Sequence, residues 1–94
     1  MNEHSMHPLT REQSDFAAEQ YRLIFSFLSE RDINTEEAYD AVLFSFLWAA
    51  QNYCEHPKLR KMAFPEVATQ YMDKALSKYL AKQARRTAAH ACAA

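Results

Sequence analysis

Apolar residues recur at the spacing of an α-helix in three stretches of the chain, and polar residues separate these stretches. The first helix is predicted over residues 11–31, where Phe16, Ile24 and Phe27 recur at helical spacing. Thr10 directly precedes this stretch and is suited to accept a hydrogen bond from the first turn of the helix. The polar sequence RDINTEE then interrupts the pattern.

The second helix is predicted over residues 36–53, with Asn34 or Thr35 as its N-terminal cap. Most of its apolar residues form one core stripe, but Phe44 and Trp48 lie outside that stripe, one turn apart. A helix that is apolar nearly all round is either central in a bundle or in contact with a second partner. Both interpretations stay open at this point.

The third helix is predicted over residues 65–86, because Pro65 suits the first position of a helix and an apolar face follows it. The connection before it, residues 56–63, contains His56 followed by Pro57, a pair that opposes helical backbone at the histidine. The connection has room for a short helical turn of its own.

The three helices predict an all-α fold, a compact bundle formed by one domain over residues 11–86. We expect a flexible N-terminus over residues 1–10 and a frayed, alanine-rich tail over residues 87–94. The composition supports a folded all-α bundle, because 49% of the 94 residues are hydrophobic and glycine is absent. Tight hairpin turns depend on glycine, so its absence argues against an all-β fold.

The remaining composition favours a cytoplasmic protein. Two cysteines, Cys54 and Cys92, do not form the disulfide framework of a small secreted domain. The N-terminal segment lacks the apolar stretch of a signal peptide. The most apolar run, residues 41–50, is half the length of a membrane span, which needs about 20 residues. We therefore expect no membrane association.

Charge is divided unevenly along the chain, although the formal net charge is only −1. Residues 1–55 carry three arginines against ten acids, a net of −7, and residues 56–94 carry eight cations against two acids, a net of +6. Lys74, Lys78 and Lys82 follow one another at the four-residue spacing of one helix face. Such a division suggests different partners at the two ends of the chain, although a solvated surface whose halves neutralise each other has the same pattern.

No catalytic or metal site assembles from the sequence. The four histidines are scattered, and His4 and His7 in the N-terminal segment lack a third metal ligand nearby. Cys54 ends an apolar stretch, which is typical of a small core residue rather than of a nucleophile. We expect a binding protein, not an enzyme, with no metal and no cofactor.

Residues 64–86, FPEVATQYMDKALSKYLAKQARR, resemble the second conserved region of sigma-70-type RNA polymerase factors. That region begins Phe-Ser-Thr-x-Ala and continues as a helix with aromatic and basic positions, and Phe64 and Ala68 match it without a gap. The sequence EEAYDAVLFSFLWAAQNY is similar to the preceding helix of the family, with Ser45 where glycine is usual. The resemblance covers about residues 14–86.

The resemblance implies a compact helical domain with two working surfaces. It places the surface that docks on core RNA polymerase on the second helix, at Asp40, Leu43 and Leu47, and we add Phe44 and Trp48 because they lie outside the core stripe. It places the surface that faces the promoter −10 element on the third helix. The residues predicted for this DNA surface are Tyr71, Lys74, Ser77, Lys78, Lys82, Arg85 and Arg86.

The chain departs from the family in two respects. Val67 and Gln70 stand where the family has aromatic residues that capture unstacked bases, and Tyr71 belongs to the apolar face, so its exposure stays open. Full sigma factors continue into a helix-turn-helix domain that the 94 residues do not contain, so a minimal factor, a fragment and a regulator of polymerase all stay open. The alternative function is a protein-interaction module without DNA binding, in which Phe44 and Trp48 contact a helical partner or a second copy.

Overall fold

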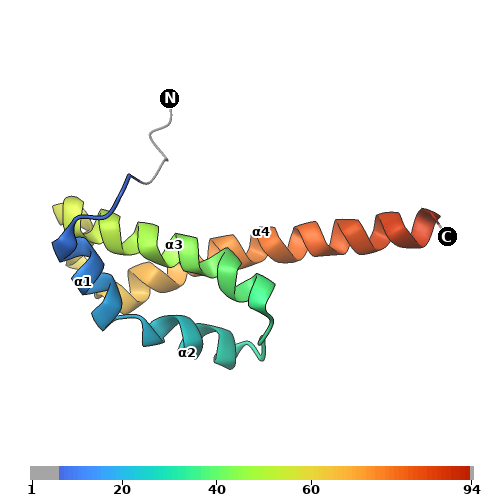
Figure 1. Cartoon of the computed structure of the whole chain (residues 1–94), viewed down its shortest axis with the longest axis horizontal. Helices are drawn as coiled ribbons and strands as arrows, with labels where there is room; N and C mark the ends of the chain where they lie inside the picture. The colour runs from blue at the N-terminus through green and yellow to red at the C-terminus, as the bar shows by residue number, and fades with distance from the viewer. Residues whose placement is uncertain (1–6, 94) are drawn as a thin grey trace.

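The structure is a computed structural model that describes the backbone of residues 7–93 and the side chains of residues 7–86. Within that part every regular element is helical, which confirms the predicted all-α bundle. The helices α3 and α4 run antiparallel and make the most extensive contact, and α1 and α2 pack against them (Figure 1). The elements are α1 (Arg11–Glu19), α2 (Arg22–Glu30), α3 (Glu36–Glu55), the 3₁₀-helix η1 (Pro57–Lys61) and α4 (Phe64–Ala93).

The first predicted helix, residues 11–31, is wrong as a single element, because the chain bends at Gln20 and Tyr21 and forms α1 and α2. At the bend the N–H of Gln20 donates to the carbonyl of Ala17 at 3.1 Å, and the N–H of Ile24 donates to the carbonyl of Tyr21 at 3.1 Å. These three-residue spacings belong to a tighter turn than an α-helix. The bend allows α1 to contact α3 while α2 contacts both α3 and α4.

Threonines cap α1 and α3 as the sequence predicted. Thr10 Oγ1 accepts from the N–H of Gln13 at 3.2 Å, and Gln13 Oε1 accepts from the N–H of Thr10 at 3.0 Å, which is a capping box. Thr35 Oγ1 accepts from the N–H of Ala38 at 3.2 Å. Of the two caps considered for the second helix, Thr35 is therefore the one in use.

The turn between α2 and α3 contains Asp32, the one residue of the described backbone with a positive φ, at 57°. The N–H of Ile33 donates to the carbonyl of Leu28 at 3.0 Å, and the N–H of Asp32 donates to the carbonyl of Ser29 at 3.0 Å. This pair of bonds is a Schellman motif, in which glycine usually occupies the left-handed position. Because the chain contains no glycine, an aspartate adopts that conformation here.

The core lies between α3 and α4 and is organised around aromatic rings. Phe64, at the start of α4, makes edge-to-face contacts with Phe16 at 4.8 Å, with Phe46 at 5.8 Å and with Tyr53 at 5.2 Å between ring centroids. Phe46 is 0% exposed. These contacts join α1, α3 and α4, and so they fix how the two long helices lie against each other.

The connection between α3 and α4 contains η1, which confirms the predicted helical turn. His56 has φ −117° and ψ 103°, the extended backbone expected of a residue that precedes proline. Arg60 donates from Nε to the carbonyl of Tyr53 at 3.0 Å and from its guanidinium to the carbonyl of Cys54. A basic side chain therefore satisfies carbonyls that the end of α3 leaves without a helical partner.

The helix α4 continues past its predicted end and reaches Ala93. Leu80, an apolar residue of this helix, is 49% exposed. The hydroxyl of Tyr79 donates to Glu37 Oε1 at 3.4 Å at the start of α3, and beyond this contact α4 projects from the bundle (Figure 1). The backbone of residues 87–93 continues α4, and the fraying predicted for residues 87–94 stays a prediction.

Residues 7–10, which the sequence assigned to a flexible N-terminus, are held against α3. The carbonyl of His7 accepts from Gln51 Nε2 at 2.9 Å, and His7 Nε2 lies 2.9 Å from Glu55 Oε2. Gln51 is 2% exposed and also donates to Gln13 Oε1 at 3.1 Å. The contacts of His7 therefore extend the packed part of the described chain at least to residue 7, N-terminal to the predicted boundary.

Candidate nucleic-acid and partner interface

The basic face of α4 is exposed and is not neutralised by the rest of the described chain. Lys74, Lys78 and Lys82 are all exposed, and none of them forms an ion pair with another described residue. Like charges four residues apart destabilise a helix by about 0.2–0.5 kcal/mol per pair. The row therefore does not stabilise α4, and its charge is available to an external anion.

A groove between α3 and α4, with a volume of about 740 Å³, brings aromatic rings next to two of these lysines. We call it the aromatic–basic groove. Its main lining residues are Phe44, Trp48, Gln70, Tyr71, Lys74 and Lys78. The sequence assigned two of these residues to a polymerase surface and three to a DNA surface, whereas the structure places all five around one hollow.

Tyr71 is half-buried, which answers the question that the sequence left open. Its hydroxyl accepts a hydrogen bond from Asn52 Nδ2 at 3.0 Å, and its ring meets the ring of Trp48 at 5.4 Å between centroids and an interplanar angle of 79°. Both contacts come from α3. The ring is therefore held in a fixed orientation at the wall of the aromatic–basic groove.

The five residues predicted for the polymerase surface differ in how much they present to a partner. Asp40 is exposed, and Phe44 is 53% exposed. Leu43 and Leu47 are half-buried and pack against the core, and Trp48 is half-buried against Tyr71. Asp40 and Phe44 are thus the two positions of this set that extend furthest from α3.

The remaining residues of the predicted DNA surface lie outside the aromatic–basic groove. Ser77 is exposed beside Lys74 and Lys78 in a second hollow, of about 600 Å³. Lys82, Arg85 and Arg86 are exposed on the part of α4 that projects from the bundle.

The two positions that depart from the family are placed differently from each other. Val67 is 1% exposed and belongs to the core, so no base can reach it. Gln70 is exposed and lines the aromatic–basic groove. Gln70 therefore presents a polar amide to the groove, whereas Val67 packs in the core.

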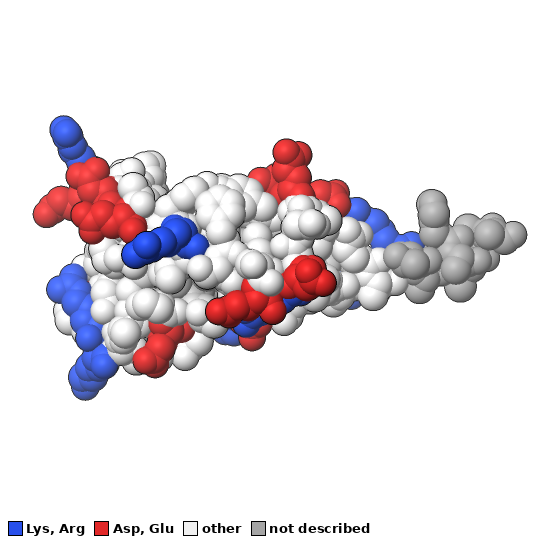
Figure 2. Space-filling view, turned by 90° about the horizontal axis from the view of Figure 1, so that it is seen from below, with Lys and Arg blue, Asp and Glu red and all other residues white. Residues whose placement is uncertain are grey.

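The acidic first half and the basic second half of the sequence do not occupy separate parts of the molecule. Because α3 and α4 are antiparallel, the acidic first turn of α3 lies beside α4 at Tyr79, where Glu37 accepts a hydrogen bond. On the face shown in Figure 2, acidic side chains lie over the bundle near the point where α4 leaves it, and basic side chains follow along the projecting helix. Acidic and basic side chains thus meet at one end of the molecule.

Sequence reasoning missed the polar residues that support this site. Asn52 orients Tyr71, and Gln51 ties the N-terminal segment to α3. Both follow an apolar run in the second predicted helix, and this abrupt change from apolar to polar was the available signal. A buried amide needs hydrogen-bond partners, which the sequence alone did not name.

Among the described residues, no cluster that could hold a metal ion lies at this site. No group of three His, Cys, Asp or Glu side chains among them is placed to hold a metal ion. Partial burial raises the pKa of the Cys54 thiol, and the nearby Arg60 guanidinium offsets this effect only in part. The thiol is therefore a weak nucleophile. No helix in the described part of the chain is long and apolar enough to cross a membrane.

The geometry defines an all-α bundle with a groove that combines aromatic rings and lysines that form no ion pair with the other described residues. No family model, curated protein or solved structure matches the chain. The function must therefore be argued from the groove and from the resemblance of residues 64–86 to sigma factors.

Proposed function

We propose that this protein is a sigma factor-like protein of transcription initiation or its regulation, which binds core RNA polymerase through α3 and promoter −10 DNA through the basic face of α4. The observation that carries the proposal is the aromatic–basic groove, where Lys74 and Lys78 lie unpaired beside Tyr71. The resemblance of residues 64–86 to sigma factors supplies the identity of the two partners.

The lysine row provides the electrostatic part of DNA binding. Cations that contact phosphates release condensed counterions, and the slope of log K against log salt is about −0.7 per contacted phosphate of a single strand. If four of the five cations on this side of α4 contact phosphates, the slope is about −3. The five cations are Lys74, Lys78, Lys82, Arg85 and Arg86.

Tyr71 provides a surface for a base. Stacking on an aromatic side chain contributes about 1–3 kcal/mol per base. Because Trp48 and Asn52 hold the ring of Tyr71 at the groove wall, the ring loses little conformational freedom when a base binds. The Tyr71 side chain is already half-buried, so we expect a contribution at the lower end of this range.

The DNA part of the proposal is tested with a paired charge reversal. In the variant Lys74→Glu with Lys78→Glu, we expect weaker binding to a fluorescent single-stranded −10 oligonucleotide and a salt slope reduced from about −3 to about −1.5. The matched control is Lys58→Glu with Lys61→Glu, which makes the same charge change at two exposed positions of η1. An affinity and a slope that stay unchanged in the first variant, measured by fluorescence anisotropy, reject the DNA surface.

The polymerase part is tested by retention on immobilised core RNA polymerase at low salt. We expect Phe44→Ala to reduce retention, because Phe44 is an exposed apolar contact on α3. The matched control is Phe25→Ala, since Phe25 is 52% exposed on α2, almost the same as the 53% of Phe44. If the folded wild-type domain is not retained, polymerase binding is rejected.

A second candidate function, a protein-interaction module without DNA binding, is supported by the exposure of Phe44 in a hollow that already contains two aromatic rings. In that case a helical partner fills the aromatic–basic groove and covers Trp48. Trp48 fluorescence quenching by iodide separates the two functions. Protection by a protein partner, together with no response to oligonucleotides, favours the interaction module.

A further inference from the structure

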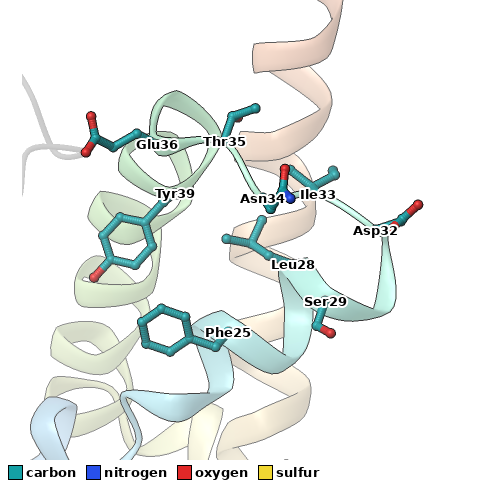
Figure 3. Close-up of a pocket in the computed structure, with 9 residues that line it drawn as sticks. All are labelled: Phe25, Leu28, Ser29, Asp32, Ile33, Asn34, Thr35, Glu36 and Tyr39. Carbon is teal, nitrogen blue, oxygen red and sulfur yellow. The ribbon is translucent and has the colours of Figure 1, made fainter.

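A second groove lies at the α2–α3 turn, away from the aromatic–basic groove, and has a volume of about 730 Å³. Its lining includes Phe25, Leu28, Asp32, Ile33, Glu36 and Tyr39, and we call it the aromatic–acidic groove. The rings of Phe25 and Tyr39 stack with centroids 5.6 Å apart and an interplanar angle of 24°. Figure 3 shows the two rings on neighbouring helices, with Asp32 and Glu36 at the edges of the groove.

The chemistry of this groove fits a cationic segment. Two of its lining residues are acids, and no lysine or arginine lines it within the described chain. The molecule already contains the same combination in another place, where the guanidinium of Arg31 lies 3.7 Å from the ring centre of Phe27 and 3.8 Å from Asp73 Oδ1. An arginine that enters the aromatic–acidic groove finds two aromatic rings, with the carboxylates of Asp32 and Glu36 at the edges.

The chain itself carries a segment of this kind. Beyond Tyr79, the side of α4 that faces solvent presents Leu80, Lys82, Arg85 and Arg86, all of which are exposed. This segment leaves the bundle at the end where the α2–α3 turn lies (Figure 1). At about 1.5 Å per residue, Arg86 stands roughly 10 Å beyond Tyr79. The cations therefore extend past the edge of their own bundle and can reach a neighbouring one.

We propose that the aromatic–acidic groove docks the projecting basic segment of α4 from a second copy of this chain. Each copy has one groove and one basic segment at the same end, so a two-fold axis between two such ends makes both contacts at once. This is an isologous and closed arrangement. Asp32 and Glu36 at the groove and Lys82, Arg85 and Arg86 on the segment give the paired surfaces opposite charges. The interface uses Lys82, Arg85 and Arg86, which the DNA proposal also counts, but not Lys74 or Lys78. Dimerisation measured without DNA therefore tests it separately from the paired reversal of Lys74 and Lys78.

The proposal is tested by swapping charges between the two surfaces. The groove variant is Asp32→Asn with Glu36→Lys, in which asparagine keeps the tolerance for a left-handed backbone. The tail variant is Arg85→Glu with Arg86→Glu. We expect the wild type to dimerise in sedimentation velocity over a concentration series, with a Kd that rises about tenfold or more between low and high salt. Each variant alone is expected to be monomeric.

The decisive sample is an equimolar mixture of the two variants. The mixture pairs a basic groove with an acidic tail at one contact and the original groove with the original tail at the other, so dimers should reappear. Circular dichroism establishes that both variants are folded, and Phe25→Ser, which removes an exposed ring, gives an independent loss of dimer. A dimer that persists in either variant, or that is lost only in Phe44→Ala, overturns the proposal.

A labelled peptide with the sequence of residues 78–86, KYLAKQARR, distinguishes a second copy from other occupants. In the docked arrangement the peptide competes with dimerisation, and the groove variant does not bind it. If the wild type is monomeric at every concentration and yet binds the peptide, the occupant is a basic segment of another protein, and the second-copy proposal is wrong.

Discussion

The left-handed residue at the end of α2 allows a stability change to be worked out from local geometry. Asp32 has φ 57° in a Schellman motif. A left-handed conformation costs an ordinary L-residue about 1–2 kcal/mol, and somewhat less for aspartate. The carboxylate also lies at the negative end of α2, which costs about 0.3–1 kcal/mol. Glycine removes both costs but loses about 0.5–1 kcal/mol more in chain entropy. We therefore expect Asp32→Gly to raise the free energy of unfolding by about 0.5–1.5 kcal/mol.

Urea unfolding monitored by circular dichroism measures this change, provided that the m-value stays constant. For a domain of this size, 1 kcal/mol corresponds to a shift in Tm of about 4–8 °C. Asp32→Asn isolates the charge contribution, because asparagine tolerates the left-handed conformation, and its gain should disappear in high salt. Asp32→Ala keeps the Cβ and should gain less than Asp32→Gly. A glycine variant that is less stable than the wild type refutes the reasoning.

Three further predictions concern the core, a helix cap and the cysteine. Phe46→Ala should lower the free energy of unfolding by about 3–5 kcal/mol in urea titrations, since the ring is fully buried, and Phe46→Leu should lose much less. Thr35→Ala should lower it by about 0.5–2 kcal/mol, because the N–H of Ala38 loses its cap; a change below the error of the titration contradicts this. In a Cys92→Ser background, iodoacetamide should modify Cys54 more slowly in the folded than in the urea-unfolded protein. Equal rates of modification in the two states contradict this. Because the pKa of the Cys54 thiol is raised in the folded protein, the unfolded chain ionises first, and the free energy of unfolding should fall as pH rises above the ordinary thiol pKa.

The sequence predicted the helices α3 and α4 because their apolar residues recur over many turns, and it predicted the caps because the threonines stand directly before them. It did not predict the bend at Gln20 and Tyr21. Neither proline nor glycine marks that place, and the apolar spacing continues across it. The bend depends on α2 contacting α3 and α4 together, which is a tertiary effect that a local pattern does not contain.

The sequence predicted the exposed lysines of the candidate site, but it did not predict the groove beside them. Spacing of four places Lys74 and Lys78 on one side of any α-helix, so the exposed pair followed from sequence alone. The aromatic–basic groove depends instead on where α3 lies along α4, because Phe44 belongs to α3 and Tyr71 to α4. Tyr71 was assigned to a DNA surface by resemblance, and Phe44 was assigned to a partner surface because it lies outside the core stripe. The packing of α3 against α4 brings both rings to the same groove.

The N-terminal segment shows that a buried polar residue can specify its neighbours more closely than a buried apolar residue does. Gln51 is 2% exposed, and its amide donates to the carbonyl of His7 and to Gln13 Oε1. A buried amide without such partners costs about 1–3 kcal/mol. An apolar residue at this position would pack against the core without specifying any neighbour. The amide instead takes one acceptor from Gln13 inside the predicted bundle and one from His7 before it. Hydrogen bonding of Gln51 thus joins residue 7 to the packed part of the chain, a contact that the hydrophobic pattern does not indicate.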